Sequence, residues 1–172
     1  MFSFDPLTGN DLPLLHEWLQ RPHVAAWWAE PATLAALERD HAPGIRGDVS
    51  TRAWIARVGT ERVGFVQSYV VLGSGDGWWE DETDPGARGI DQFLAHAHQL
   101  GRGLGSTMVR AFVERLFLDP AVTLVQTDPA PGNERAIRSF RRAGFVSVGE
   151  VETPDGPAHL MRVTRAGLRL AR

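Results

Sequence analysis

The sequence predicts one α+β domain over residues 1–172, a central mixed β-sheet flanked by about four helices. Apolar residues recur with a period of two in some segments and at helical spacing in others, in the order β-α-α-β-β-β-α-β-α-β-β. A strand, a helix and a strand follow one another between residues 90 and 127. This succession requires a crossover connection, and therefore a parallel pair of strands inside the sheet.

The N-terminal half predicts a strand, two helices and a hairpin. Asn10 is expected to cap the first helix, and a Pro- and Gly-rich loop at residues 43–47 is expected to follow the second. Turn residues at 59–62 join the two strands of the hairpin. The expected elements are a strand at 2–7, helices at 12–21 and 33–41, and strands at 53–58 and 63–72.

The C-terminal half predicts two helices among four strands. A loop with five glycines covers residues 73–89, and a second glycine-rich loop covers residues 101–105. The helix after that loop carries an apolar stripe typical of a buried face, and Gly144 is expected to end the last helix. The expected elements are strands at 90–95, 122–127, 145–151 and 157–163, and helices at 106–118 and 133–143.

Composition excludes several classes of function. The chain has no cysteine, which excludes disulfides, thiolate metal sites and a cysteine nucleophile. His96 and His98 have no third ligand nearby in the sequence, so no metal is expected. Neither a secretory signal nor an apolar stretch of about 20 residues is present, so we expect a cytoplasmic protein that does not interact with membranes. We also expect a monomer, because no helix has a second apolar face.

Negative charge gathers in the middle of the chain. Only Arg88 offsets six carboxylates there, which are Asp76, Glu80, Asp81, Glu82, Asp84 and Asp91. This distribution argues against a nucleic-acid partner and suits a cationic ligand, although a solvated acidic loop is the simpler explanation of charge alone. The pair Trp78-Trp79 favours a ligand, because exposed indoles in a polar loop otherwise have nothing to pack on.

The glycine loop Gly101-Arg102-Gly103-Leu104-Gly105 opens directly into a helix at Ser106. Backbone N–H groups at such a junction can surround a phosphate, helped by the positive end of the helix dipole. The alternative is a strand-to-helix turn that binds nothing. A dinucleotide-binding fingerprint would need glycine at Ser106, and a P-loop would need Gly-Lys-Ser/Thr, so both are excluded.

Residues 133–145, Asn-Glu-Arg-Ala-Ile-Arg-Ser-Phe-Arg-Arg-Ala-Gly-Phe, resemble a signature of the GNAT acetyltransferase superfamily. The glycine loop resembles that superfamily's pyrophosphate-binding motif, although Leu100 stands where Arg or Gln is usual. Within the superfamily, six segments resemble aminoglycoside 6'-N-acetyltransferases. These segments are 67–69, three stretches within the acidic middle of the chain (73–80, 83–86 and 88–92), 126–129 and 153–157.

The resemblance implies acetyl-coenzyme A as cosubstrate and an aminoglycoside, a small polycation, as acceptor. It implies that backbone N–H groups of Gly101, Arg102, Gly103, Leu104, Gly105 and Ser106 bind the pyrophosphate. It also implies that the backbone at Asp91, Gln92 and Phe93 pairs with the pantetheine arm, and that Asn133 lies near the coenzyme. Capping its own helix is an equally good role for Asn133.

Asp91 is the expected base that deprotonates the acceptor amine, with Asp76 as the second candidate. Asp91 interrupts an apolar strand just before the glycine loop, where a carboxylate has little structural use except as a strand-end cap. A carboxylate is a weak base for an alkylammonium. Three ways to promote the attack stay open: a raised pKa of the carboxylate, a water that relays the proton, or orientation of the ammonium by the charge alone. Many superfamily members have a tyrosine acid at the position of Phe140, so here the thiolate leaves unaided or takes its proton from water or substrate. Phe140 itself is expected to pack on the cofactor or in the core.

The acceptor is expected to meet carboxylates from separate loops and the two indoles. Asp76, Asp128 and Asp155 are expected to converge, although each also suits a turn. Trp78 or Trp79 would stack on a sugar ring or an ammonium, and residues 80–84 would form a screened acidic rim. Other acceptors, such as a protein N-terminus or another small amine, stay open, as does a coenzyme A-binding module without catalysis.

Overall fold

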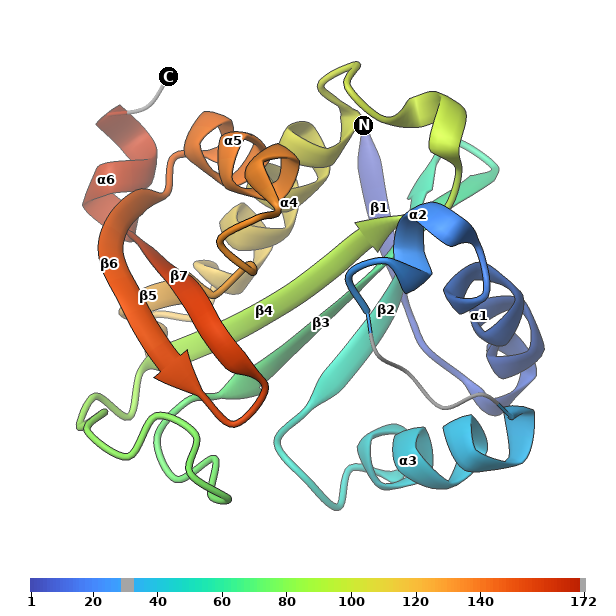
Figure 1. Cartoon of the computed structure of the whole chain (residues 1–172), viewed down its shortest axis with the longest axis horizontal. Coiled ribbons are helices and arrows are strands. Elements are labelled where there is room, and N and C mark those ends of the chain that lie inside the picture. Colours follow the sequence, from blue (N-terminus) through green and yellow to red (C-terminus); the bar gives the residue numbers. More distant parts are fainter. Residues whose placement is uncertain (29–32, 171–172) are drawn as a thin grey trace. The chain divides into compact units, whose positions relative to one another are not determined.

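The computed structural model describes residues 1–28 and 33–170, and its seven-stranded mixed sheet with helices confirms the predicted α+β class. The strands are hydrogen-bonded in the order β1-β2-β3-β4-β5-β7-β6 (Figure 1). β4 and β5 are parallel, with Ala87 opposite Leu124, which confirms the predicted crossover. The chain forms two compact units: unit 1 comprises residues 1–68 and 91–100, and unit 2 comprises residues 69–90 and 101–172.

Unit 1 is built on an antiparallel arrangement of β1, β2 and β3, in which Phe4 lies opposite Ala56. α1 packs on α3, and α3 packs on β2 (Figure 1). The side chains of Leu15, Trp18 and Phe65 fill the core between them. Its elements are β1 (Phe2–Pro6), a 3-10 helix (Gly9–Asp11), α1 (Leu12–Leu19), α2 (Pro22–Ala25), α3 (Leu34–Arg46), β2 (Arg52–Val58), most of β3 (Glu61–Val70), the end of β4 (Ala87–Leu94) and a second 3-10 helix (Ala97–Gln99).

Two predictions in unit 1 were wrong. Asn10 does not cap the first helix; instead the Asp11 carboxylate accepts from the backbone N–H of Thr8 at 3.0 Å, one turn earlier. The loop expected at residues 43–47 is helical, because α3 continues through Pro43. The helix ends only at Gly47, whose φ of 90° is a left-handed conformation that glycine adopts without steric cost.

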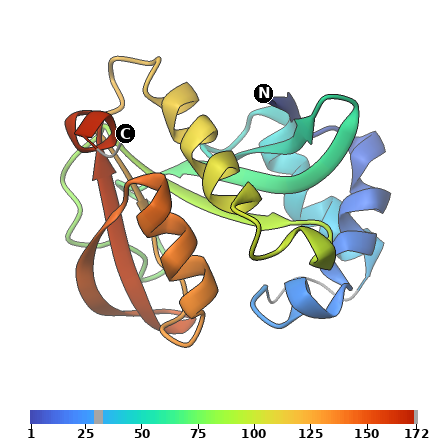
Figure 2. The same cartoon turned by 90° about the horizontal axis from the view of Figure 1, so that it is seen from above.

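Unit 2 has a parallel β4–β5 pair, an antiparallel β5–β7–β6 arrangement and three helices. α5 runs beside α4 (Figure 2). The predicted apolar stripe of α4 is buried at Met108, Val109, Phe112 and Val113. Gly144 ends α5 with a φ of 107°, as predicted. The elements are α4 (Leu104–Leu116), β5 (Leu124–Thr127), α5 (Glu134–Ala143), β6 (Val146–Thr153), β7 (Gly156–Thr164) and α6 (Arg165–Leu170).

Most boundaries differ from the sequence prediction by one or more residues, and two short helices were not predicted. β4 begins at Ala87 rather than at residue 90, because the register with β5 extends through Arg88 and Gly89, which interrupt the apolar pattern. α4 begins two residues early, at Leu104. The described residues contain six α-helices rather than about four, because α2 and α6 are too short to show periodicity. No helix in the described ranges is long and apolar enough to span a membrane.

Candidate active site

The glycine loop leads into α4, whose first backbone N–H groups have no partner within the helix. Gly101 and Gly103 have φ values of 74° and 83°, and an added Cβ on either would meet nothing within 4 Å. Glycine is therefore needed here for its backbone conformation and not for lack of space. Thr107 N–H is the first to bond within the helix, to Gly103 O at 3.1 Å. The N–H groups before it point out of a 13-residue helix that has no acidic residue in its first turn, an arrangement suited to an anion.

Asn133 and Phe140 lie on the other helix of the signature, α5. Asn133 Oδ1 accepts from Ala136 N–H at 3.2 Å, which confirms its role as the helix cap. The amide NH₂ of this side chain is not used by the cap, since capping needs only the oxygen. Phe140 is 3% exposed and its ring lies 5.4 Å from the ring of Phe145, edge to face. This burial favours the core role of Phe140 over a contact with the coenzyme.

Asp91 is a half-buried residue of β4 that accepts a hydrogen bond from the amide of Gln67 on β3. The distance from Gln67 Nε2 to Asp91 Oδ2 is 3.0 Å. Residue 67 belongs to one of the segments that carry the family resemblance, but no pattern in the sequence pairs it with Asp91. Oε1 of the next residue, Gln92, is buried without a hydrogen-bond partner among the described residues. Such an acceptor suits an amide N–H of a ligand laid along the strand.

Phe93 takes part in the core of unit 1 through its side chain. Its ring stacks on Phe65 at 5.5 Å and meets Trp28 and Trp18 edge to face at 5.2 and 6.4 Å. With the side chain 8% exposed, only the backbone of Phe93 is suited to contact a coenzyme, as the resemblance implied.

Two side chains that sequence reasoning missed hold the end of β4. Arg21 Nη1 donates to Ala95 O at 2.6 Å and to His96 Nδ1 at 3.0 Å. His23 Nε2 lies 3.0 Å from Leu94 O and is the donor, because a carbonyl oxygen can only accept. Carbonyl groups that an ordinary sheet would pair with a neighbouring strand are thus satisfied by side chains. No three metal-ligating side chains gather in the described part of the chain.

The loop at residues 73–86 of unit 2, hereafter the acidic loop, has a defined and strained backbone. Trp78 N–H donates to Gly75 O at 2.9 Å, and the residues between them, Asp76 and Gly77, have φ values of 52° and 84°. These values are typical of a type I′ turn, for which Asp-Gly is a preferred sequence. Trp79 also has a positive φ, 51°, at a cost of about 1–2 kcal/mol for a residue with a Cβ. Its ring lies 5.8 Å from that of Trp78.

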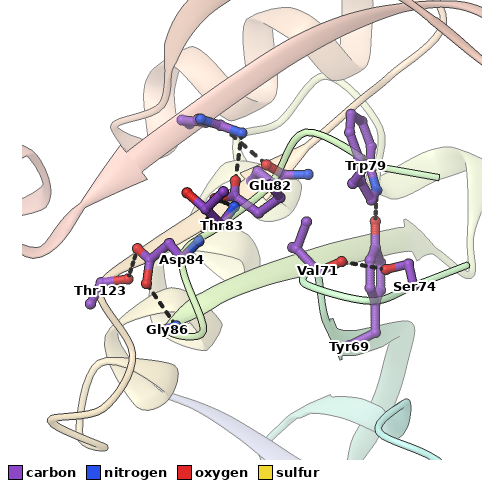
Figure 3. Close-up of polar contacts among 11 residues, drawn as sticks. Tyr69, Val71, Ser74, Trp79, Glu82, Thr83, Asp84, Gly86 and Thr123 are labelled. Carbon is purple, nitrogen blue, oxygen red and sulfur yellow. Dashed lines mark hydrogen bonds and ion pairs between the residues drawn. The ribbon is translucent and has the colours of Figure 1, made fainter.

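The acidic rim expected at residues 80–84 is only partly correct, because Glu82 and Asp84 are structural. The Glu82 side chain, 9% exposed, accepts from Arg162 Nη2 at 2.9 Å and from the N–H groups of Thr83 and Asp84. Asp84 accepts from the Thr123 hydroxyl and from the N–H of Gly86, and these bonds lower its pKa (Figure 3). Both carboxylates therefore bind the loop to the rest of unit 2, whereas Glu80 and Asp81 are exposed.

The loops that carry Asp76 and Asp155 approach each other within unit 2. A Cβ on Gly77 would lie 3.5 Å from Cγ of Pro154, so the residues next to these two carboxylates are nearly in contact. Asp155 is exposed in the turn between β6 and β7, and its N–H donates to the Thr153 hydroxyl, so it has the expected turn role as well. Asp128 is half-buried and follows β5 directly. Convergence of all three carboxylates stays a prediction.

Unit 1 contains a cavity of about 460 Å³ beside Gln67, the partner of Asp91. His41 and Trp54 are among the side chains that line it. Burial lowers the pKa of His41, whose ring also meets Phe65 edge to face at 6.0 Å. The cavity thus extends from the His41 ring to the side chain that holds Asp91.

Comparison with known proteins shows the family to which the chain belongs. Residues 8–153 match the model of an acetyltransferase (GNAT) domain. The chain is 53% identical over 170 residues to "Aminoglycoside N(6')-acetyltransferase type 1" of Klebsiella pneumoniae, covering 96% of this chain and 84% of the relative. It is 61% identical over 95 residues to a kanamycin resistance protein of Rhizobium radiobacter, covering 55% of this chain and 88% of the relative.

A solved structure of the aminoglycoside acetyltransferase AAC(6')-Ib with coenzyme A and kanamycin has a TM-score of 0.93 and 52% identity, covering 99% of this chain and 98% of that one. The glycine loop at the start of α4, the capped helix α5 and the family match over most of the chain lead to one conclusion. This protein belongs to the GNAT acetyltransferase family and is an acetyl-coenzyme A-dependent enzyme.

Proposed function

We propose that this enzyme transfers the acetyl group of acetyl-coenzyme A to the 6'-amine of aminoglycoside antibiotics and thereby confers resistance to them. The whole chain would act as one acetyltransferase domain and as a monomer, in the cytoplasm, where acetyl-coenzyme A is available. Its relatives with the highest identity given above carry this activity or kanamycin resistance in their names.

The main support for this proposal is the fixed conformation of the acidic loop. A merely solvated acidic loop needs no strained residue, yet Trp79, which is not a usual turn residue, has a left-handed φ of 51°. Backbone strain of this kind persists only where surrounding contacts enforce it, and it gathers at functional sites. The result is an exposed carboxylate and two indoles presented by a fixed loop, a surface suited to a polycation whose sugar rings have apolar faces.

The cosubstrate fits the residues that are present. N–H groups from Gly101 to Ser106 would bind its pyrophosphate, and the Asn133 amide would reach its arm. The backbone at residues 91–93 would pair with the pantetheine, and the orphaned Gln92 Oε1 would accept one of its amide N–H groups.

Catalysis by direct attack follows from these roles. Asp91, oriented by Gln67, would take a proton from the 6'-ammonium directly or through a water. The neutral amine would attack the thioester carbon, the C–S bond would break, and the thiolate would take its proton from water or substrate. Phe140 has no proton to give. Asp76, Asp128, Asp155 and the two indoles Trp78 and Trp79 would hold the rest of the acceptor.

Thiol release from acetyl-coenzyme A tests the reaction and the position attacked. We expect turnover with kanamycin and tobramycin, and none with an analogue that has a hydroxyl in place of the 6'-amine. Equal turnover with that analogue would refute 6' selectivity. Turnover only with peptides or simple amines would replace the aminoglycoside by another acceptor.

Asp91→Asn tests the base, because the asparagine oxygen still accepts from Gln67 while the negative charge is lost. We expect kcat/KM to fall about 10²–10⁴-fold, the usual contribution of a general base, with coenzyme A affinity unchanged. A variant with wild-type turnover would move the role to Asp76. Loss of coenzyme A binding as well would mean that Asp91 is structural.

A further inference from the structure

The indole of Trp79 uses its one polar atom inside the protein. Nε1 donates to the hydroxyl of Tyr69 at 3.1 Å, and the side chains point toward each other (Figure 3). An indole has a single N–H and accepts no hydrogen bonds through its nitrogen. With that donor engaged, Trp79 has only the faces and edges of its ring to offer to a ligand.

Tyr69 is itself fixed by the strand beside it. Val71 N–H donates to Ala87 O, and β3 and β4 are neighbours, so the antiparallel register places Tyr69 opposite Gly89. A Cβ on Gly89 would lie 2.0 Å from Cζ and 2.4 Å from Oη of Tyr69. The phenol ring therefore lies directly on the backbone of β4, and only glycine leaves room for it.

We propose that Tyr69 is a positioning residue for the acceptor site, which acts by holding the ring of Trp79 in one orientation. The inference rests on the proposed function, because it assumes that Trp79 meets the acceptor. A stacking or cation–π contact depends on the angle between ring and ligand, so a swivelling indole would bind more weakly. The contacts from Gly89 to Tyr69 and from Tyr69 to Trp79 link the sheet to the acidic loop. The strained φ of Trp79 fixes only its backbone, so the orientation of its ring depends on the hydrogen bond to Tyr69.

Tyr69→Phe tests this role, since it keeps the ring on Gly89 and removes only the hydroxyl. We expect the KM for kanamycin to rise about three- to ten-fold, the effect of one hydrogen bond between neutral groups. The kcat and the KM for acetyl-coenzyme A should stay at wild-type values. Ser147→Ala is the matched control: it removes a hydroxyl that contacts His159 at 2.9 Å elsewhere in unit 2, and should leave all three constants unchanged.

A double-mutant cycle with Trp79→Phe separates positioning from a general structural effect. Phenylalanine at 79 keeps an aromatic face but has no N–H, so adding Tyr69→Phe to it should cause no further rise in the kanamycin KM. An equal rise in both backgrounds would overturn the inference, as would a Tyr69→Phe enzyme with the wild-type KM. Wild-type protein that acetylates no aminoglycoside would instead refute the proposed function, and this inference with it.

Discussion

Glu82→Ala should destabilise the protein although the residue lies in an acidic loop. The Glu82 carboxylate accepts one charge-assisted bond from Arg162 at 2.9 Å and two backbone bonds, at 3.0 and 2.9 Å. A bond between charged groups contributes about 1.5–3 kcal/mol, and each backbone bond about 0.5 kcal/mol where water can replace the acceptor. The Arg162 side chain is 34% exposed and also donates to Gln126, so water and Gln126 offset part of the loss. We expect the free energy of unfolding to fall by about 2–4 kcal/mol.

Urea denaturation followed by circular dichroism would measure this change, and thermal denaturation should show a fall in Tm of roughly 5–15 °C for a chain of this size. Glu80→Ala is the control, because Glu80 is exposed in the same loop and should change the free energy of unfolding by less than about 0.5 kcal/mol. Glu82→Gln keeps both backbone bonds, so its free energy of unfolding should lie between those of Glu82→Ala and Glu80→Ala. A Glu82→Ala protein as stable as the Glu80→Ala protein would show that the network does not hold the loop.

Three further predictions concern other parts of the molecule. Burial lowers the pKa of His41 from 6.5, so the unfolded state binds the proton first as the pH falls, and the free energy of unfolding should decrease below about pH 6.5. His41→Asn should reduce this decrease, measured by urea titrations at several pH values. An unchanged pH profile would contradict the prediction. Gly103→Ala, at a φ of 83°, should cost about 1–2 kcal/mol in urea denaturation and weaken coenzyme A binding in calorimetry. Gly9→Ala should do neither, because a Cβ there also has space and Gly9 has no positive φ. Phe140→Tyr should cost about 1–3 kcal/mol, because it buries an unpartnered hydroxyl, without raising kcat; a large gain in kcat in steady-state assays would show that this position reaches the thiolate after all.

The sequence alone predicted the fold class and most elements, because both depend on local patterns. The buried stripe of α4, the Asn133 cap and the Gly144 end of α5 follow from spacing and capping chemistry over a few residues. Local rules failed at two boundaries. α3 continues through Pro43, a residue that often ends a helix, and β4 begins at Ala87 because pairing with β5 extends it.

For the candidate site, the sequence located the glycine loop, the acidic loop and Asp91, since these stand out as residue types in unusual places. Only the tertiary structure showed which side chains hold them. Gln67 beside Asp91, Tyr69 beside Trp79 and Arg162 beside Glu82 are pairs separated by 24, 10 and 80 positions. A hydrogen bond between such residues depends on strand register and loop geometry, which no local pattern encodes. For the same physical reason, only the folded structure separates the half-buried carboxylates that anchor the loop, Glu82 and Asp84, from the exposed ones, Glu80 and Asp81.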